Sequence, residues 1–494
     1  MSTQTAGTIA AEHVSKEELE RILAVQREAF LREGPPSAEV RRNRIDRLML
    51  AILEAADPLA EALEQDYGRR PVALSKMFDV LSWLSDAKVN RENLDEWMKP
   101  VVLEGPPPAF IEQKPKGVVG VMGAWNFPIS LTIHPAFAAL AAGNRVMMKF
   151  PENHPRTGRV LAQAVAKYFA EDEVAVLLGC LETAKEFSTL PLDHIVLTGS
   201  PAVGKAVASA AAKNLVPVTL ELGGKNPVVL GRDANLEQSA ERLAIARAMN
   251  GGQVCSCPEY VFVPRANFDT FKTKLEEEFR KLFPTFLDNP AAVAIVNDRN
   301  YDRITALIDD ATAKGATKLQ VVAADEAKSL PSQDKRLIPP TILTDVPAEA
   351  KINDEEVFGP VISLFPYDDI SEAIDYIQHR PAALCAYYYG EDGDDFQAFV
   401  RGTTSGGVTR NDCFAHQTVP GAPFGGVGQS GYGAYHGKAG FDELTHRRTV
   451  AAPEGGRSFA EGSTGQPVLN PEVEAGVDQL IAGEVADLQG RLGL

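Results

Sequence analysis

Two cysteines, Cys255 and Cys257, stand two positions apart in the stretch NGGQVCSCPEY. Such a pair can bind a metal, form a disulfide, fill a core or include a nucleophile. A zinc site needs further ligands at suitable spacing, but the sequence has no other C-x-C and no C-x-x-C or H-x-x-x-H. A disulfide over two positions is geometrically awkward, and an inert buried thiol stays open for either cysteine. Gly251 and Gly252 favour a nucleophile at Cys255, because they let a ligand approach the backbone closely.

A nucleophilic thiol needs a nearby base and a donor for the developing oxyanion. The stretch LELGGKNP places Glu221 at the end of an apolar run, before two glycines. A carboxylate there is poorly solvated and has a raised pKa, which suits a general base. The alternative is a surface glutamate at the end of a strand.

The stretch GSPAVGKA, residues 199–206, reads G-x-x-x-x-G-K but continues with Ala206. A P-loop needs Ser or Thr there to hold magnesium, so NTP hydrolysis is disfavoured. A glycine turn that opens a helix still offers free N–H groups and a positive dipole end to an anion. A plain turn is the alternative. No G-x-G-x-x-G occurs in this region, so an ordinary Rossmann dinucleotide site is not supported.

The elements that position these residues follow from the hydrophobic period. Residues 15–100 have helical spacing. Short apolar runs then alternate with helical segments, which predicts βαβ units and a parallel sheet with ligands at the carboxyl ends of its strands. The expected strands lie at 117–123, 145–150, 174–179, 194–199 and 217–222, and in a second α/β region at 226–230, 259–264, 291–296, 340–345, 361–368 and 405–412.

Composition narrows the class of protein. The 494 residues predict two or three domains, and the net charge of −18 argues against nucleic acid or an anionic membrane as a partner. The sequence shows no signal peptide and no uninterrupted apolar run long enough to span a membrane. Five cysteines, an odd and low number without framework spacing, are typical of the cytoplasm.

Seven stretches occur in the order typical of one family: GAWNFP, KFPE, TGSPAVG, LELGGKNP, GGQVC, EEVFGP and PFGGVGQSG. Together they resemble the NAD(P)-dependent aldehyde dehydrogenase superfamily, from about residue 20 to about residue 450. The 34 positions between Glu221 and Cys255 match its spacing of base and nucleophile. PFGGVGQSGYGAYHGKAGFDELTHRR looks like the class 3 branch, and the N-terminal helices with WMKP resemble the coniferyl-aldehyde dehydrogenases of that branch.

The resemblance implies a role for each matching residue. Cys255 becomes the catalytic thiol, Glu221 the general base and Asn126 the side-chain donor of the oxyanion hole, while Cys257 is a neighbour without a role. No metal is needed. The implied cofactor residues are Trp125, Lys149 and Glu152 (the last two on the adenosine ribose), Gly199, Ser200 and Gly204 at the pyrophosphate turn, and Glu356 and Phe358 at the nicotinamide ribose.

The implied reaction is oxidation of an aldehyde to the acid through a thiohemiacetal and a thioester on Cys255. NAD is expected because Glu152 repels a 2′-phosphate, and NADP stays possible. The expected substrate is an aromatic or bulky apolar aldehyde, with a medium-chain aliphatic aldehyde or a catalytically silent protein as alternatives. The expected walls of an apolar tunnel are Phe127, Leu131, Val254 and Phe414.

The implied fold is α/β, with two parallel-sheet domains and a small oligomerisation β-arm. The expected cofactor domain covers residues 1–103 and 116–222, and the catalytic domain 223–422. The arm and a bridging segment cover 104–115 and 423–455, and a tail with an amphipathic helix covers 456–494. Exposed strand edges in the arm predict a homodimer, and the stripe from Val473 to Leu492 predicts a terminal helix packed on its own or the partner subunit.

Overall fold

The computed structural model describes residues 13–105, 108–452 and 471–494. The chain divides into two compact units. The first comprises Met1–Lys99 and Gln113–Arg447, and the second Pro100–Glu112 and Arg448–Leu494. Residues 456–470, which hold most of the predicted connector, lie outside the described residues.

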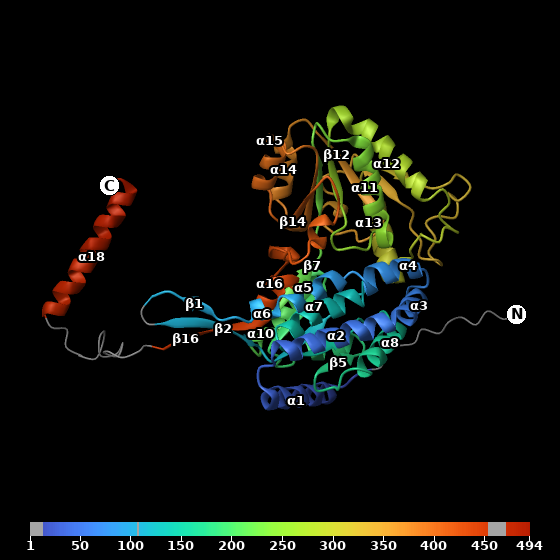
Figure 1. Ribbon diagram of the computed structural model, residues 1–494. Coiled ribbons are helices and arrows are strands. Elements are labelled where there is room, and N and C mark those ends of the chain that lie inside the picture. Colours follow the sequence, from blue (N-terminus) through green and yellow to red (C-terminus); the bar gives the residue numbers. More distant parts are fainter. Residues whose placement is uncertain (1–12, 106–107, 453–470) are drawn as a thin grey trace. The chain divides into compact units, whose positions relative to one another are not determined.

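The first unit contains two sheets with helices around each (Figure 1). The six-stranded sheet has the order β15-β7-β6-β3-β4-β5, and all its pairs are parallel except that of β15 with β7. Its strands are β3 (Val118–Met122), β4 (Arg145–Lys149), β5 (Val174–Leu177), β6 (His194–Gly199), β7 (Val218–Leu222) and β15 (Gly431–Tyr432). β15 brings a segment from late in the chain beside Glu221, which lies opposite Gly431.

Helices connect and cover this sheet. Serine side chains cap several of them: Ser15, Ser37 and Ser200 each accept an N–H from the first turn of the helix that follows. The helices are α1 (Lys16–Glu33), α2 (Ala38–Glu54), α3 (Ala56–Tyr67), α4 (Val72–Ser75), a π-helical turn η1 (Lys76–Val80), α5 (Leu84–Glu92), α6 (Leu94–Trp97), α7 (Ser130–Ala141), α8 (Pro155–Ala166), α9 (Leu181–Phe187), α10 (Pro201–Ala212) and α16 (Gly437–Glu443).

The seven-stranded sheet has the order β10-β11-β12-β9-β8-β13-β14, with only the β10–β11 pair antiparallel. Its strands are β8 (Pro227–Leu230), β9 (Tyr260–Pro264), β10 (Thr317–Gln320), β11 (Thr341–Thr344), β12 (Val361–Tyr367), β13 (Ala383–Tyr389) and β14 (Ser405–Arg410). Its helices are α11 (Leu236–Ala248), α12 (Phe268–Leu282), α13 (Asp298–Ala313), α14 (Ile370–Gln378) and α15 (Asp394–Gly402). In α12, Phe271, Leu275 and Phe279 recur every fourth residue and form its buried stripe.

The strand predicted at 291–296 is wrong, because this buried segment is irregular. Its backbone groups bond elsewhere: Ala294 donates to the Arg69 carbonyl, Ile295 to the Arg336 carbonyl, and Val296 to Oε1 of Gln253. These partners replace a neighbouring strand, so an apolar run reads like a strand without being one. The sequence reading also missed β10 and β13.

The second unit contains the outer part of a three-stranded sheet of order β1-β2-β16, formed by β1 (Val101–Leu103), β2 (Ala109–Pro115) and β16 (Thr445–Ala451). β1 and β2 are antiparallel, with Val101 opposite Ile111. The unit also contains α18 (Pro471–Leu492), so the predicted terminal helix is confirmed as a helix. Its apolar side chains Val477, Leu480, Ile481, Val485, Leu488 and Leu492 are exposed.

Two parallel-rich α/β sheets confirm the predicted fold class. The sheets divide the chain near residue 223, where the sequence places the border between its two main domains, and the exact domain boundaries stay a prediction. None of the described helices combines the length and the apolar character that crossing a membrane requires.

Candidate active site

The predicted site residues gather at one edge of the six-stranded sheet. Lys149 and Gly199 are the last residues of β4 and β6, and Glu221 is next to last in β7. The segment that follows β3 contains Asn126. Because these strands are parallel, their carboxyl ends meet at one edge, where α/β sheets bind ligands.

A tight backbone turn presents Cys255. Asn250, Gly251 and Gly252, which follow α11, all have positive φ values of 49°, 64° and 75°. A side chain on Gly252 would collide with the Gly359 carbonyl group. Glycine is therefore required by both conformation and space, and the turn brings the EEVFGP stretch against the cysteine segment.

Asn226 fastens the cysteine segment to the second sheet. Its Nδ2 donates to the carbonyl oxygens of Cys255 and Cys257, at 2.8 and 2.9 Å, and its Oδ1 accepts the N–H of Cys385 at 2.9 Å. Asn226 is completely buried. Asn226 stands in the stretch LELGGKNP, where nothing in the sequence predicts this role.

Glu221 and Cys255 influence each other electrostatically. Glu221 is 1 % exposed, and burial raises the pKa of its carboxyl group to about 8, against a smaller lowering by the Cys255 thiol and the Thr198 hydroxyl. Burial, and next the nearby Glu221, raise the pKa of the Cys255 thiol well above its ordinary value. Neither Glu221 oxygen has a hydrogen-bond partner among the described residues. A base kept unpaired beside a thiol can accept a proton from that thiol or from water.

The segment with Asn126 is held through its backbone. The Tyr67 hydroxyl donates to the carbonyl oxygens of Trp125 and Asn126, both at 3.2 Å, and Nδ2 of Asn250 donates to the same Asn126 carbonyl at 3.1 Å. The Asn126 side chain is 2 % exposed and has no hydrogen bond to another described residue. The amide is thus left to donate to a substrate oxygen.

Lys149 and Glu152 form the next part of the edge. Burial lowers the pKa of Lys149, whose Nζ donates to the Phe150 carbonyl at 2.7 Å and lies 3.5 Å from Oε2 of Glu152. Glu152 is partly exposed, so the pair offers one donor and one acceptor to a ligand. This donor set fits the two hydroxyls of a ribose.

The turn after β6 supplies the positive end of a helix. Ser200 caps α10 by accepting the N–H of Val203. A side chain on Gly204 would collide with Leu222, so this glycine lets α10 lie close to β7. A helix N-terminus at the ligand edge fits a pyrophosphate.

Glu356 and Phe358 come to the same edge from the second sheet. A side chain on Gly223 would collide with the Glu356 carboxyl group, whose pKa burial raises to about 8. Phe358 has a positive φ of 50°, and its ring meets Trp125 edge-on with centroids 5.2 Å apart. The predicted cofactor residues therefore lie around one carboxyl edge, and they fit a dinucleotide.

Cys257 packs in the core. It is 1 % exposed, its Sγ donates to the Ala246 carbonyl at 3.3 Å, and burial raises its pKa to about 11. Because Cys257 is buried whereas Cys255 is partly exposed, Cys257 is the less accessible of the two thiols. All five cysteines of the chain are free.

The four residues predicted to line a tunnel have different surroundings. Leu131 and Val254 are buried, while Phe127 and Phe414 are half-buried. Phe127 lies beside Phe78, and Phe414 beside Tyr387. Leu131 belongs to α7 and Val254 precedes Cys255 in the chain. A common passage walled by the four stays a prediction.

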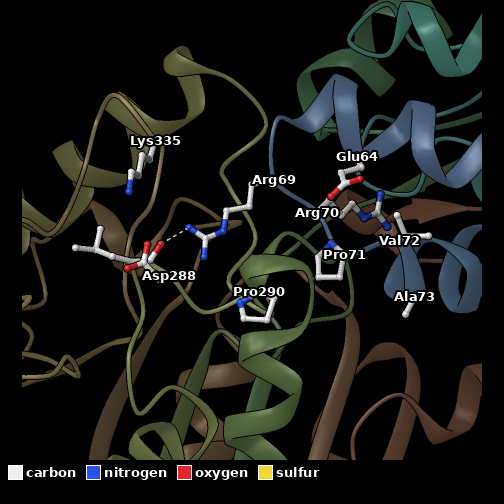
Figure 2. A pocket seen from close by; sticks show the side chains of 10 residues that line it. Glu64, Arg69, Arg70, Pro71, Val72, Ala73, Asp288, Pro290 and Lys335 are labelled. Carbon is white, nitrogen blue, oxygen red and sulfur yellow. Dashed lines mark hydrogen bonds between the residues drawn. The ribbon is translucent and has the colours of Figure 1, made fainter. Parts of the chain in front are cut away.

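A cavity of about 650 Å³ lies elsewhere in the first unit (Figure 2). It is bordered by residues 69–73 on one side and Leu287, Asp288 and Pro290 on the other. None of the predicted site residues lines it. Arg69 bridges the two sides by donating to the Leu287 carbonyl at 2.5 Å.

Three residues near the site were missed by the sequence reading: Tyr67, Thr198 and Asn250. Their signal is weak because each acts through a contact distant in sequence. Tyr67 bonds to Asn126, which lies 59 positions away in the sequence. Asn250 also bonds to Asn126, which lies 124 positions away from it. Thr198 stands in the quoted stretch TGSPAVG, but only the fold puts it near Glu221.

Comparisons with known proteins match most of the chain. The model of the aldehyde dehydrogenase family matches residues 2–450. A probable coniferyl aldehyde dehydrogenase of Caulobacter vibrioides is 39% identical, over 94% of this chain and 96% of that protein. A rat aldehyde dehydrogenase, described as dimeric and NADP-preferring, is 35% identical over 86% and 92%. The solved Staphylococcus aureus AldH in a substrate-bound state has a TM-score of 0.82 and 31% identity, over 89% of this chain and 95% of that one.

Proposed function

Because this chain belongs to the aldehyde dehydrogenase family and is an NAD(P)-dependent aldehyde dehydrogenase, we propose that it oxidises an aromatic aldehyde such as coniferyl aldehyde, with Cys255, Glu221 and Asn126 as its catalytic residues. The observation that carries these roles is the unpaired, buried carboxyl group of Glu221 beside the Cys255 thiol.

The chemistry follows from the positions of these groups. Glu221 accepts the thiol proton, and the Cys255 thiolate adds to the aldehyde carbon to give a thiohemiacetal oxyanion. The Asn126 amide and the Cys255 backbone N–H donate to that oxyanion. A nicotinamide held by Glu356 and Phe358 would supply the acceptor for the hydride that leaves the former aldehyde carbon. Loss of the hydride leaves a thioester on Cys255. Glu221 passes the first proton to solvent and then takes a proton from water, which adds to the thioester. The acid is released, and the departing Cys255 thiolate takes up the proton from Glu221.

Cofactor binding follows from the same edge of the sheet. Lys149 and Glu152 hold the adenosine ribose, the Gly199–Ser200 turn with α10 holds the pyrophosphate, and Glu356 and Phe358 hold the nicotinamide ribose. The Glu152 carboxylate favours NAD, because it repels a 2′-phosphate. The rat relative, described as NADP-preferring, favours the opposite choice, so the ratio of kcat/KM for the two cofactors is a direct test.

The substrate proposal rests on the relatives and on the apolar surroundings of the thiol. The 39% identical relative is described as a probable coniferyl aldehyde dehydrogenase. Phe127, Leu131, Val254 and Phe414 are the apolar side chains we assign to the substrate passage. We further propose a cytoplasmic homodimer. The cytoplasmic location is supported by the free state of all five cysteines. The homodimer is supported by the rat relative, which is described as dimeric.

A panel of aldehydes tests the substrate class. Coniferyl aldehyde, benzaldehyde and linear aldehydes of increasing length are compared by the absorbance of reduced cofactor. We expect the highest kcat/KM with the coniferyl compound. A higher kcat/KM for a medium-chain linear aldehyde would show that the substrate is aliphatic and not aromatic. The proposed roles of the catalytic residues would stay unchanged.

A further inference from the structure

Arg70 and Asp79 form an ion pair in the interior of the first unit. The Arg70 Nη2 lies 2.6 Å from Oδ2 of Asp79, and both side chains are fully buried. Nε and Nη1 of Arg70 have no hydrogen-bond partner among the described residues. Burying two charges costs more free energy than such an incomplete pairing returns. Stability alone is therefore a poor explanation for this pair.

Asp79 contacts the start of α7. Its Oδ1 accepts the N–H of Ile129 at 3.1 Å and lies 3.5 Å from the N–H of Ser130. The residue at the capping position, Ile129, has no side chain that could cap the helix. Asp79 thus replaces the missing cap, and its charge suits the positive end of the helix. Asp79 itself lies in the π-helical turn η1, a geometry often found at functional sites.

Arg70 contacts the residues that precede α7, within the segment 125–130. Its Cζ lies 4.9 Å from the centre of the Tyr67 ring and 5.2 Å from that of Phe127. Tyr67 in turn donates to the carbonyl oxygens of Trp125 and Asn126. Figure 2 shows that Arg69 and Arg70, although adjacent, extend in different directions, so only Arg70 serves this segment.

We propose that Arg70 and Asp79 are a positioning pair for residues 125–130, which hold the Asn126 amide where the thiohemiacetal oxyanion forms. The pair contacts the segment at two places. Asp79 accepts N–H groups at the start of α7, and Arg70 lies against the rings of Tyr67 and Phe127. This inference rests on the proposed oxyanion role of Asn126. Its consequence is that the pair affects catalysis only through that amide.

The test combines five variants of the full chain. The double variant Arg70→Met/Asp79→Asn removes both charges together, so no unpaired charge stays buried. Asn126→Ala removes the amide, and the triple variant removes both. Glu173→Gln is the control, because Glu173 forms ion pairs with Arg44 and Arg47 of α2 and has no hydrogen bond to residues 125–130. Arg70→Lys repeats the test in a chain that keeps a cation beside Asp79.

Two rates are measured for each variant. The burst of reduced cofactor in a single turnover reports hydride loss from the thiohemiacetal. Alkylation of Cys255 by iodoacetamide reports the thiol in a reaction that forms no oxyanion. We expect the double variant to lose about 10- to 100-fold in burst rate, Arg70→Lys to lose less, and both to keep the parental alkylation rate. Asn126→Ala should lose about 10²–10³-fold, and the triple variant should lose no more than Asn126→Ala.

Three results would overturn the inference. An unchanged burst rate in the double variant and in Arg70→Lys, with Asn126→Ala slow, would contradict the positioning role alone. Losses that multiply in the triple variant would mean that the pair acts by another route. A full burst rate in Asn126→Ala would remove the oxyanion role of Asn126, and the positioning role with it.

Discussion

The side chain of Asn226 donates to the carbonyl oxygen of Cys255 at 2.8 Å. This bond joins the glycine-rich stretch after Glu221 to the segment that carries Cys255, the proposed nucleophile. It therefore relates the positions of base and thiol through one buried amide group.

Asn226→Ala should lower both stability and kcat. The variant leaves the carbonyl oxygens of Cys255 and Cys257 without their donor, which costs about 1–3 kcal/mol in the free energy of unfolding. Chemical denaturation and steady-state kinetics measure the two effects. Asn235→Ala is the control, because Asn235 caps α11 and should reduce stability alone. Parental kcat in Asn226→Ala would show that this amide does not position the thiol.

The hydrolysis of the thioester should depend on pH through Glu221. Burial raises the pKa of this carboxyl group to about 8, so the group is mostly protonated near neutral pH and acts as a base only as the pH rises. We expect the rate of acid release to increase up to about pH 8 and then to level off. In Glu221→Gln this dependence should disappear, with a rate loss of about 10²–10⁴-fold. A pH profile that Glu221→Gln leaves unchanged would exclude Glu221 as the base.

The same pKa shift has the opposite consequence for stability. Between the ordinary pKa of 4.5 and about 8, the folded chain keeps a proton that the unfolded chain has lost. The free energy of unfolding contributed by Glu221 therefore falls as the pH rises through this window. Glu221→Gln should become more stable than the parent from about pH 5 to about pH 8. Thermal unfolding at several pH values measures the difference, and a constant difference would contradict the burial of an ionisable carboxyl group.

Glu152→Gln should raise kcat/KM for NADP relative to NAD. The change removes the charge that repels a 2′-phosphate but keeps an oxygen that accepts from a ribose hydroxyl. Steady-state kinetics with both cofactors give the ratio, and Glu182→Gln, a change of an exposed carboxylate in α9, serves as the control. A parent enzyme that already prefers NADP would contradict the role of Glu152.

The sequence predicted the fold and the site to different depths. Motif order assigned roles to Cys255, Glu221 and Asn126, and these roles stay a proposal. The apolar runs located most strands, because a strand buried in a parallel sheet leaves a local signal. The strand expected at 291–296 failed because its backbone groups bond to Arg69, Arg336 and Gln253, which no local pattern reveals. β13 was missed although its seven residues are all apolar or aromatic.

Residues that support the site were harder to predict for a related reason. Asn226 was read as part of a motif, but its partners lie 29 and 31 positions away. Arg70 and Asp79 stand in helical sequence that carries no motif, and only the fold brings them to the segment with Asn126.

The chain should form a homodimer in solution. The sheet β1-β2-β16 has exposed strand residues in Val101, Val102 and Leu103, and α18 exposes its apolar side chains. Light scattering on the full chain and on a chain ending at Gly455 measures mass and the contribution of α18. A full-length monomer at micromolar concentration would contradict the dimer. Unchanged mass and thermal stability after truncation would contradict docking of α18 and leave the dimer intact.

The most direct test of the account is the identification of the acylated residue. Glu221→Gln, in which hydrolysis should be slowed more than the first hydride transfer, is mixed with coniferyl aldehyde and NAD. It is quenched with acid once its first turnover is complete and digested for tandem mass spectrometry. We predict a thioester on Cys255, with none on Cys257, and no adduct in Glu221→Gln/Cys255→Ala, while Glu221→Gln/Cys257→Ala still carries it. An acyl group on Cys257, or a full burst of reduced cofactor without an adduct on Cys255, would contradict the assignment of Cys255 as the nucleophile.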